Sequence, residues 1–99
     1  MKSITAIELQ QLLKNNNDIQ LIDVREPFEH HQFNIGGQLI PINNVLKNIA
    51  AIDKKKLVIF YCKKGIRSQI AIQKLQQKFA FTNLVNLNGG IEAWQKATV

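Results

Sequence analysis

Runs of hydrophobic residues alternate along the chain with stretches in which hydrophobic positions recur every three or four residues. The most hydrophobic run covers residues 57–61, and such a run is typical of a parallel strand that is covered on both faces. We predict that it forms the central strand of a sheet. Residues 19–24 and 84–87 predict two further strands, and Leu39 and Ile40, closed by Pro41, predict a short one.

Helical patterns lie between these strands. Thr5 and Glu8 have the spacing of a capping box, which predicts a helix that begins after Thr5 and ends at the polar residues 15–18. Residues 68–79 predict a second helix. The hydrophobic positions of the two helices are Ala6, Leu9, Leu12 and Leu13 in the first, and Ala71, Ile72, Leu75 and Phe79 in the second.

Shorter helices complete the pattern. Pro27 opens a helical turn that reaches residue 31, Asn43 or Asn44 could cap a helix with hydrophobic positions from 45 to 50, and residues 91–96 predict a final helix. Because strands alternate with helices, we expect one α/β domain over residues 1–99. Its sheet should be small and mainly parallel, and flanked by helices on both faces.

The composition excludes several kinds of protein and of site. A chain of 99 residues can form one hydrophobic core, and no hydrophobic run approaches the ~20 residues that a membrane-spanning helix needs. Residues 1–4 lack the hydrophobic core of a signal peptide. The single cysteine excludes an internal disulfide and a zinc site with several cysteines, and it fits a reducing compartment. We therefore expect a cytoplasmic protein with no membrane partner.

The net charge of +6 raises the question of nucleic-acid binding. The lysines are spread along the chain, apart from residues 54–56 and the pair Lys63 and Lys64. No aromatic residues interleave with them to form a stacking platform. We expect no nucleic-acid partner, because a solvated basic surface explains the charge. Attraction of a small anionic substrate is a further alternative.

The residues with candidate chemistry follow the predicted central strand. Cys62 comes directly after it, and five residues separate Cys62 from Ser68, where a helix is expected to begin. Ligands of open α/β sheets bind beyond the carboxyl ends of the strands, where a loop can turn its N–H groups inward as an anion cradle. Gly65 permits an unusual backbone, the following helix adds its positive end, and Arg67 adds a forked charge.

Such a loop would stabilise the thiolate of Cys62 and hold an anionic group against the sulfur. Both effects suit a nucleophile that attacks an anionic donor. The structural alternative is a buried and inert cysteine, which is the commoner role of a lone cysteine.

Four segments, in this order, resemble the motifs of rhodanese-like domains. Residues 62–68 resemble the family's active-site loop, which has a cysteine, four residues and an arginine. Residues 23–29 look like its Asp-Val-Arg-Glu segment, residues 34–41 like its His-Ile-x-Gly-Ala stretch, and residues 88–94 like its C-terminal Gly-Gly-x-x-x-Trp segment. Each motif alone is weak, but the four together are specific and span nearly the whole chain.

This resemblance implies a sulfurtransferase. A sulfane sulfur would pass from thiosulfate or a similar anionic donor to Cys62, as a persulfide, and then to cyanide or a thiol, with no cofactor and no metal. The substrate-binding residues would be Lys63, Lys64, Gly65, Ile66, Arg67 and Ser68. The alternative is a non-catalytic or persulfide-carrier module that acts with a partner protein, such as a protein sulfur acceptor.

Two departures and one rival activity bear on this interpretation. Asn34 and Gln38 stand where the family usually has histidine and alanine, in a loop that we expect to be structural. Related phosphatases place five residues between cysteine and arginine, enough to surround a phosphate. Here four residues separate them, and position 68 is a serine. The shorter loop favours a persulfide sulfur over a phosphoryl group.

Two further pairs of residues have candidate roles. Asp23 and Arg25 are predicted as supporting residues at a strand end, where Asp23 could orient Arg67 or the loop backbone, or tie the strand to its neighbouring helix. His30 and His31 are adjacent, so on a helix they point about 100° apart and cannot easily share a metal. We expect them on a solvated helix face.

Overall fold

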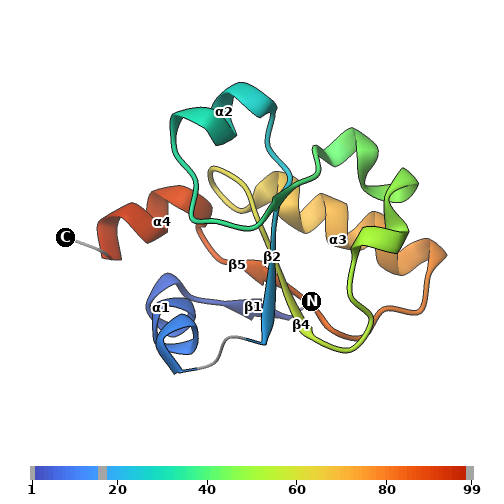
Figure 1. The fold of residues 1–99 in the computed structure, drawn as a ribbon, viewed down its shortest axis with the longest axis horizontal. Coiled ribbons are helices and arrows are strands. Elements are labelled where there is room, and N and C mark those ends of the chain that lie inside the picture. The colour runs from blue at the N-terminus through green and yellow to red at the C-terminus, as the bar shows by residue number, and fades with distance from the viewer. Residues whose placement is uncertain (1, 16–17, 98–99) are drawn as a thin grey trace.

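The computed structural model describes residues 2–15 and 18–97, which form a five-stranded sheet with helices on both faces (Figure 1). The order across the sheet is β1-β5-β4-β2-β3, and every neighbouring pair is parallel. This arrangement confirms the predicted fold class and the central place of residues 57–61. The strands are β1 (Ser3–Ile4), β2 (Ile19–Asp23), β3 (Gln38–Leu39), β4 (Leu57–Tyr61) and β5 (Leu84–Leu87).

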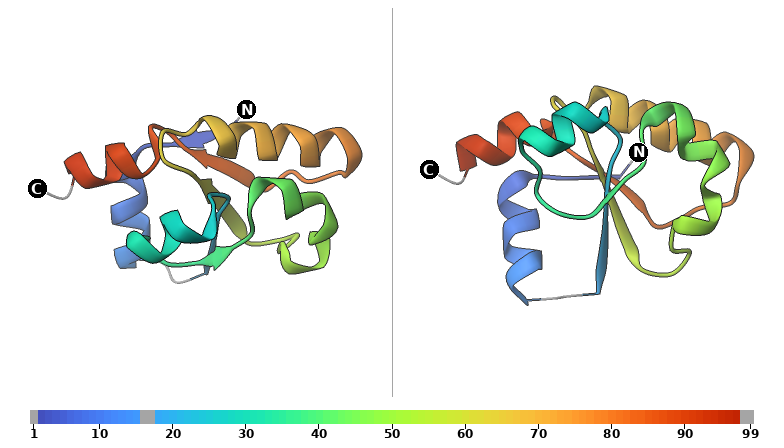
Figure 2. Two further views of the ribbon diagram at one scale, coloured as in Figure 1. Left: turned by 90° about the horizontal axis from the view of Figure 1, so that it is seen from above. Right: turned by 45° about the horizontal axis from the view of Figure 1, so that its top comes forward.

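Helices cover the two sides of the sheet unequally. Figures 1 and 2 show α1 and α4 on one side, α3 with two short 3₁₀-helices on the other, and α2 beyond the carboxyl end of β2. None of these helices, within the described chain, is long and apolar enough to cross a membrane. Their bounds are α1 (Ala6–Asn15), α2 (Pro27–Gln32), η1 (Ile42–Lys47), η2 (Ile49–Ala51), α3 (Ile66–Lys78) and α4 (Gly90–Ala97).

The central strand β4 supplies residues to two hydrophobic clusters. Val58 and Phe60 are buried in the cluster on the α3 side, and Ile59 and Tyr61 in the cluster on the α1 side. Successive side chains of a strand point to opposite faces, so a run without polar residues is what a doubly covered strand requires. The carboxyl end of β4 is thereby fixed from both sides.

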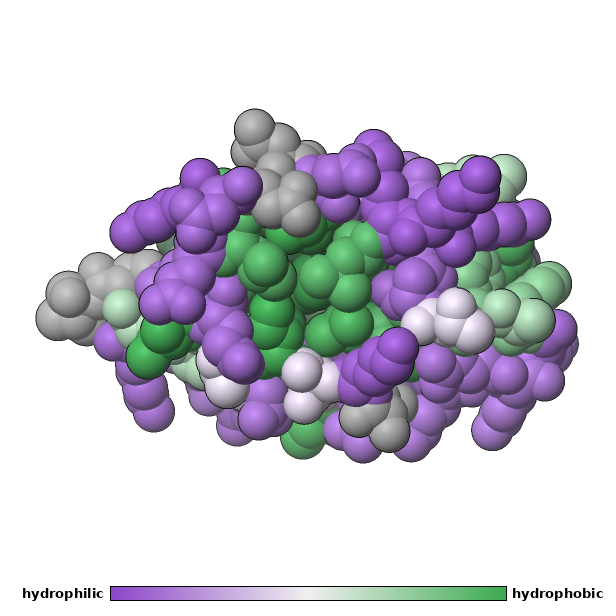
Figure 3. Space-filling model, turned by 90° about the horizontal axis from the view of Figure 1, so that it is seen from below, coloured by the Kyte–Doolittle hydropathy of each residue, from purple (hydrophilic) through white to green (hydrophobic). Residues whose placement is uncertain are grey.

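The α1 side of the sheet is covered only in part. Seen from below in Figure 3, hydrophobic side chains gather at the centre of this face within a rim of polar ones. The second cluster is bordered by partly buried hydrophobic residues, which include Leu12, Leu13, Ile19, Leu21 and Leu57. This incompletely covered surface lies at the opposite end of the strands from Cys62.

Most predicted elements are confirmed, and the capping box before α1 is formed. Thr5 Oγ1 accepts the N–H of Glu8 at 3.1 Å, and Glu8 Oε1 accepts the N–H of Thr5 at 2.9 Å. α1 ends at Asn15, whereas Asn16 and Asn17 of the predicted stop lie outside the described residues. α3 begins at Ile66 rather than at residue 68.

One strand was missed and two expectations are wrong in detail. β1 was not predicted, because two residues carry too little pattern to indicate a strand. The helix expected after Asn43 or Asn44 is a 3₁₀-helix that begins at Ile42, and the N–H of Asn44 instead donates to Pro41 O at 2.7 Å. Phe79 does not lie on the buried face of α3. It follows the last turn, is 40% exposed and contacts the ring of Phe81.

The turn between β5 and α4 packs directly on the loop that follows β4. The N–H groups of Ile91 and Glu92 donate to Cys62 O at 2.9 Å and to Lys63 O at 3.1 Å. Gly90 has a φ of +59°, and a Cβ at this position would collide with both carbonyl oxygens. Only glycine therefore allows α4 to begin so close to the loop.

Polar contacts hold α2, since none of its residues is buried. The guanidinium of Arg67 donates to both carboxylate oxygens of Glu29, at 2.7 and 2.9 Å. His30 Nδ1 lies 2.8 Å from Asp23 Oδ2. The hydrogen bond from Arg67 lowers the pKa of Glu29 from 4.5 to about 2. The position of α2 thus depends on an ionised glutamate.

We predict that Gly90→Ala lowers the free energy of unfolding by about 2–4 kcal/mol, because the new methyl group must push α4 away from the loop. Gly36→Ala is the matched control. Gly36 also has a positive φ, of +95°, but a Cβ there would meet only Leu21 Cδ1, at 4.0 Å. Denaturant unfolding of both variants separates the effect of the collision from that of backbone strain. Equal losses of unfolding free energy in the two variants would contradict the predicted collision at position 90.

We also predict that Glu29→Gln lowers the free energy of unfolding at pH 7 by about 1–2 kcal/mol, a modest value because Arg67 is about one-third exposed. The pKa of Glu29 is lower in the folded state than in the unfolded chain. The stabilisation is therefore complete above about pH 5 and is lost as the pH falls toward 2. The unfolding free energies of the wild type and the variant should therefore converge at low pH. Glu26→Gln, which changes an exposed glutamate of the same segment, is the control. A difference that stayed constant from pH 7 to pH 2.5 would refute this assignment.

Candidate active site

Cys62 lies directly after β4, at the carboxyl end of the sheet. The loop that it begins passes between α2 and the start of α4 (Figures 1 and 2). Cys62 is only 1% exposed, and three polar groups converge on its sulfur. The N–H of Gly65 donates to Sγ at 3.1 Å and the N–H of Ser68 at 3.4 Å, while Ser68 Oγ lies 3.4 Å away. Backbone donors aimed at one atom favour negative charge on that atom.

Gly65 gives the loop its shape. Its φ of +91° places it in the left-handed region, where it caps the first turn of α3. A Cβ here would lie 3.1 Å from Gly89 N and 3.2 Å from Leu87 O, so the loop also needs a small residue for its contact with the β5–α4 turn. The turn at Gly65 brings the start of α3, the positive end of its dipole, against the sulfur.

A buried polar pair supports the loop from β5. Ser68 Oγ donates to Asn86 Oδ1 at 2.5 Å, and Asn86 Nδ2 donates to Gly65 O at 3.1 Å. Both side chains are almost completely buried. Asn86 was missed in the sequence analysis. The available signal was a polar residue in the middle of a hydrophobic strand, which must find partners inside the protein.

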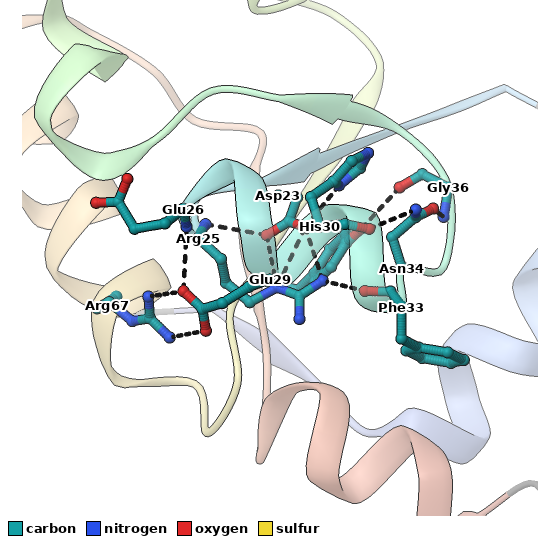
Figure 4. A network of polar contacts seen from close by, with 10 residues as sticks. Asp23, Arg25, Glu26, Glu29, His30, Phe33, Asn34, Gly36 and Arg67 are labelled. Carbon is teal, nitrogen blue, oxygen red and sulfur yellow. Dashed lines mark hydrogen bonds and ion pairs between the residues drawn. The ribbon is translucent and has the colours of Figure 1, made fainter.

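Arg67 faces Glu29, another residue that the sequence analysis missed. Figure 4 shows the two side chains aligned, with two hydrogen bonds between them. Such a paired geometry is the strong form of an arginine–carboxylate contact. The fork of Arg67 is therefore occupied, and the expectation that it binds a donor stays a prediction. The pairing joins α2 to the first turn of α3, directly after the Cys62 loop, across 38 positions of sequence.

Asp23 and Arg25 form a second polar unit (Figure 4). The carboxylate of Asp23 accepts hydrogen bonds from Arg25, the shortest at 2.9 Å, and also contacts His30. Arg25 Nη2 donates to Phe33 O at 2.6 Å. Asp23 thus ties β2 to the neighbouring helix, as the structural alternative proposed, and it is Glu29 that engages Arg67. The expectation of a solvated His30 is wrong, because the docking of α2 on β2 turns this side chain inward to 17% exposure.

A pocket of about 140 Å³ lies beside Cys62. It is lined by Cys62, Lys63, Lys64, Ile66 and Arg67. The structure therefore brings together five of the residues that were singled out in the sequence. Lys63 and Lys64 are exposed, so their ammonium groups can meet an anion from solution. In the described parts of the chain, no three His, Cys, Asp or Glu side chains gather as they would around a metal ion.

Two larger hollows lie at different distances along the strands from this pocket. One, of about 390 Å³, lies between α2 and α4 and borders the same loop at Lys63; its lining includes Phe28, Glu29 and Phe33. The other, of about 230 Å³, lies beside Lys54 and Phe81, at the opposite end of the strands. Of these two, only the first shares a lining residue, Lys63, with the Cys62 pocket.

Comparison with known proteins assigns the family. The sequence matches the family model of the rhodanese-like domain over residues 5–97. It is 38% identical to the probable adenylyltransferase/sulfurtransferase MoeZ of Mycobacterium tuberculosis over 95% of this chain, which spans 24% of that protein. It is 32% identical to the thiosulfate sulfurtransferase GlpE of Coxiella burnetii, over 95% of this chain and 87% of that one.

Solved structures agree with the sequence comparison. A rhodanese-like domain protein from Staphylococcus aureus superposes with a TM-score of 0.85 at 30% identity, covering 95% of this chain and 91% of that chain. The parallel α/β fold of this chain is thus shared with a related protein. The chain belongs to the family of rhodanese-like domains.

Proposed function

We propose that this protein transfers a sulfane sulfur by way of a persulfide on Cys62. The observation that carries the proposal is the convergence of two backbone N–H groups on the sulfur, in a pocket that contains two lysines. These groups suit a sulfur atom that carries negative charge in both the thiolate and the persulfide state. Relatives named as sulfurtransferases, 32–38% identical to this chain, support the reaction class.

The proposed reaction has two steps. With thiosulfate as donor, the thiolate of Cys62 attacks the outer sulfur and forms a new S–S bond. The bond within thiosulfate breaks, and sulfite leaves with the electron pair. Cyanide or a thiolate then attacks the terminal sulfur of the persulfide, removes it as thiocyanate or as a new persulfide, and restores the Cys62 thiolate. The N–H groups of Gly65 and Ser68 would hold the charge on sulfur, while Lys63 and Lys64 would attract the anionic donor.

The second candidate function is a persulfide carrier that receives its sulfur from one protein and delivers it to another. The hollow beside Lys63 favours it, because Phe28 and Phe33 line that hollow and are 65% and 40% exposed. Exposed aromatic side chains next to a reactive group offer contact area for a protein partner. In both versions we place the protein in the cytoplasm, where reductants keep its single cysteine as a thiol. Turnover with free thiosulfate separates the two.

We predict that the intact mass of the protein rises by one sulfur atom after incubation with thiosulfate and returns after addition of cyanide. Cys62→Ser should gain no mass and produce no thiocyanate, since a hydroxyl group cannot form a persulfide. Circular dichroism of the variant checks that the fold is intact. Reversible sulfur loading of Cys62→Ser would refute the assignment of the nucleophile. A wild-type protein that gains no sulfur from free thiosulfate would favour the carrier.

We predict that the double variant Lys63→Ala, Lys64→Ala raises KM for thiosulfate by roughly tenfold at low salt and leaves kcat nearly unchanged, because exposed charges act on capture of the donor. The difference should shrink at high salt, where the attraction is screened within about 8 Å or less. The matched control is Lys54→Ala, Lys55→Ala, which removes two exposed lysines at the other end of β4. A fall in kcat with constant KM would show that the loop lysines act on the chemistry instead.

A further inference from the structure

Arg67 lines the Cys62 pocket, yet Glu29 uses both ends of its guanidinium (Figure 4). The carboxylate is fixed from its own helix as well, because Glu29 Oε1 also accepts the backbone N–H of Glu26 at 3.1 Å. An arginine and a carboxylate in this geometry form a pair with little net charge. A donor that enters the pocket therefore meets a neutral pair where the sequence alone shows a cation.

We propose that Glu29 sets the charge selectivity of the Cys62 pocket, so that the site favours sulfane-sulfur donors with one negative charge, such as an organic thiosulfonate or persulfide, over dianions such as thiosulfate. The inference rests on the proposed function and deepens it, since it names the donor class of the same site. Glu29 is a specificity-determining residue that acts through Arg67.

Simple electrostatics gives the direction of the effect. Coulomb energy scales with the product of the charges, so cancelling one positive charge costs a dianion twice the attraction that it costs a monoanion. Solvent screens the pair only in part, because the side chain of Glu29 is 17% exposed and that of Arg67 is 36% exposed. Lys63 and Lys64 are exposed and attract either donor through solvent, where salt reduces their effect.

The shape of the surroundings favours the same class of donor. The hollow between α2 and α4 borders Lys63 and Glu29 and is lined by Phe28 and Phe33. A donor with an organic group on its leaving side can place that group against the aromatic rings while its outer sulfur reaches Cys62. A small dianion has no group to place against these rings, and the charged residues that line the hollow, Glu29 and Glu92 with Arg25 and Lys63, balance in sign.

Thiosulfate and methanethiosulfonate test the inference as a matched pair. Each carries its outer sulfur on a sulfonyl group, but a methyl group replaces one charged oxygen in methanethiosulfonate. Transfer to the Cys62 thiolate releases sulfite from the first and methanesulfinate from the second. We expect Glu29→Gln to raise the ratio of kcat/KM for thiosulfate to that for methanethiosulfonate by roughly five- to tenfold. This ratio does not depend on the fraction of active protein, so partial unfolding of the variant leaves it unchanged.

Two control variants separate charge from position. Glu29→Asp keeps the carboxylate, so its donor ratio should stay near that of the wild type even if both rates fall. Glu26→Gln removes an exposed carboxylate of the same segment, and its ratio should change less than twofold. A Glu29→Gln variant that slows both donors equally would overturn the proposal and leave Glu29 as a structural residue.

Alkylation of Cys62 tests the same inference without sulfur transfer. Iodoacetate is an anion and iodoacetamide is neutral, and both alkylate the same thiolate. Glu29→Gln should raise the ratio of the iodoacetate rate to the iodoacetamide rate by about threefold or more. A raised ratio in a protein that transfers no sulfur would support the charge selectivity and contradict the proposed function. An unchanged ratio in a protein that does transfer sulfur would support the function and overturn the role of Glu29.

Discussion

The first turn of α4 holds the two carbonyl groups on which the shape of the Cys62 loop depends. Its N–H groups bind the oxygens of Cys62 and Lys63. Because these carbonyls point toward α4, the N–H of Gly65 and that of Ser68, in the first turn of α3, can turn toward the sulfur. The contact requires the close approach at Gly90. The turn after β5 and the loop after β4 thus form one structural unit, brought together by the parallel pairing of two neighbouring strands.

Polar contacts replace hydrophobic packing along the carboxyl edge of the sheet. Three links fix the segments there: Asp23 to Arg25 and His30, Glu29 to Arg67, and Ser68 to Asn86. Buried polar groups that are fully paired strengthen one another and specify a single arrangement, whereas an unpaired one is costly. This edge can therefore remain accessible to charged substrates and still be rigid. The two hydrophobic clusters stabilise the sheet below it.

The sequence predicts those features that depend on local pattern, and it misses those that depend on packing. β4 is a run of five hydrophobic residues, and the loop after it carries a cysteine, a glycine and an arginine in fixed spacing, so both were predictable. Glu29 has no such local sign, because its partner is 38 positions away. The same holds for His30, which is turned inward only when α2 meets β2. β1 gains its partner from β5, at the far end of the chain.

The positive groups around the sulfur are of two kinds: charged side chains, and uncharged N–H groups of the backbone. The charged ones either lie in solvent, as do Lys63 and Lys64, or are neutralised, as is Arg67 by Glu29. The groups that touch the sulfur itself are uncharged N–H dipoles and the start of α3. Salt weakens the attraction exerted by the charged side chains. It scarcely affects the N–H groups, because dipoles fixed in a buried loop neither titrate nor exchange counterions. The backbone thus surrounds the Cys62 sulfur with N–H groups, whereas in the proposed function the side chains select among donors. The net charge of +6 predicts neither the N–H groups at the sulfur nor the charge of the pocket, because these depend on which charged groups are paired.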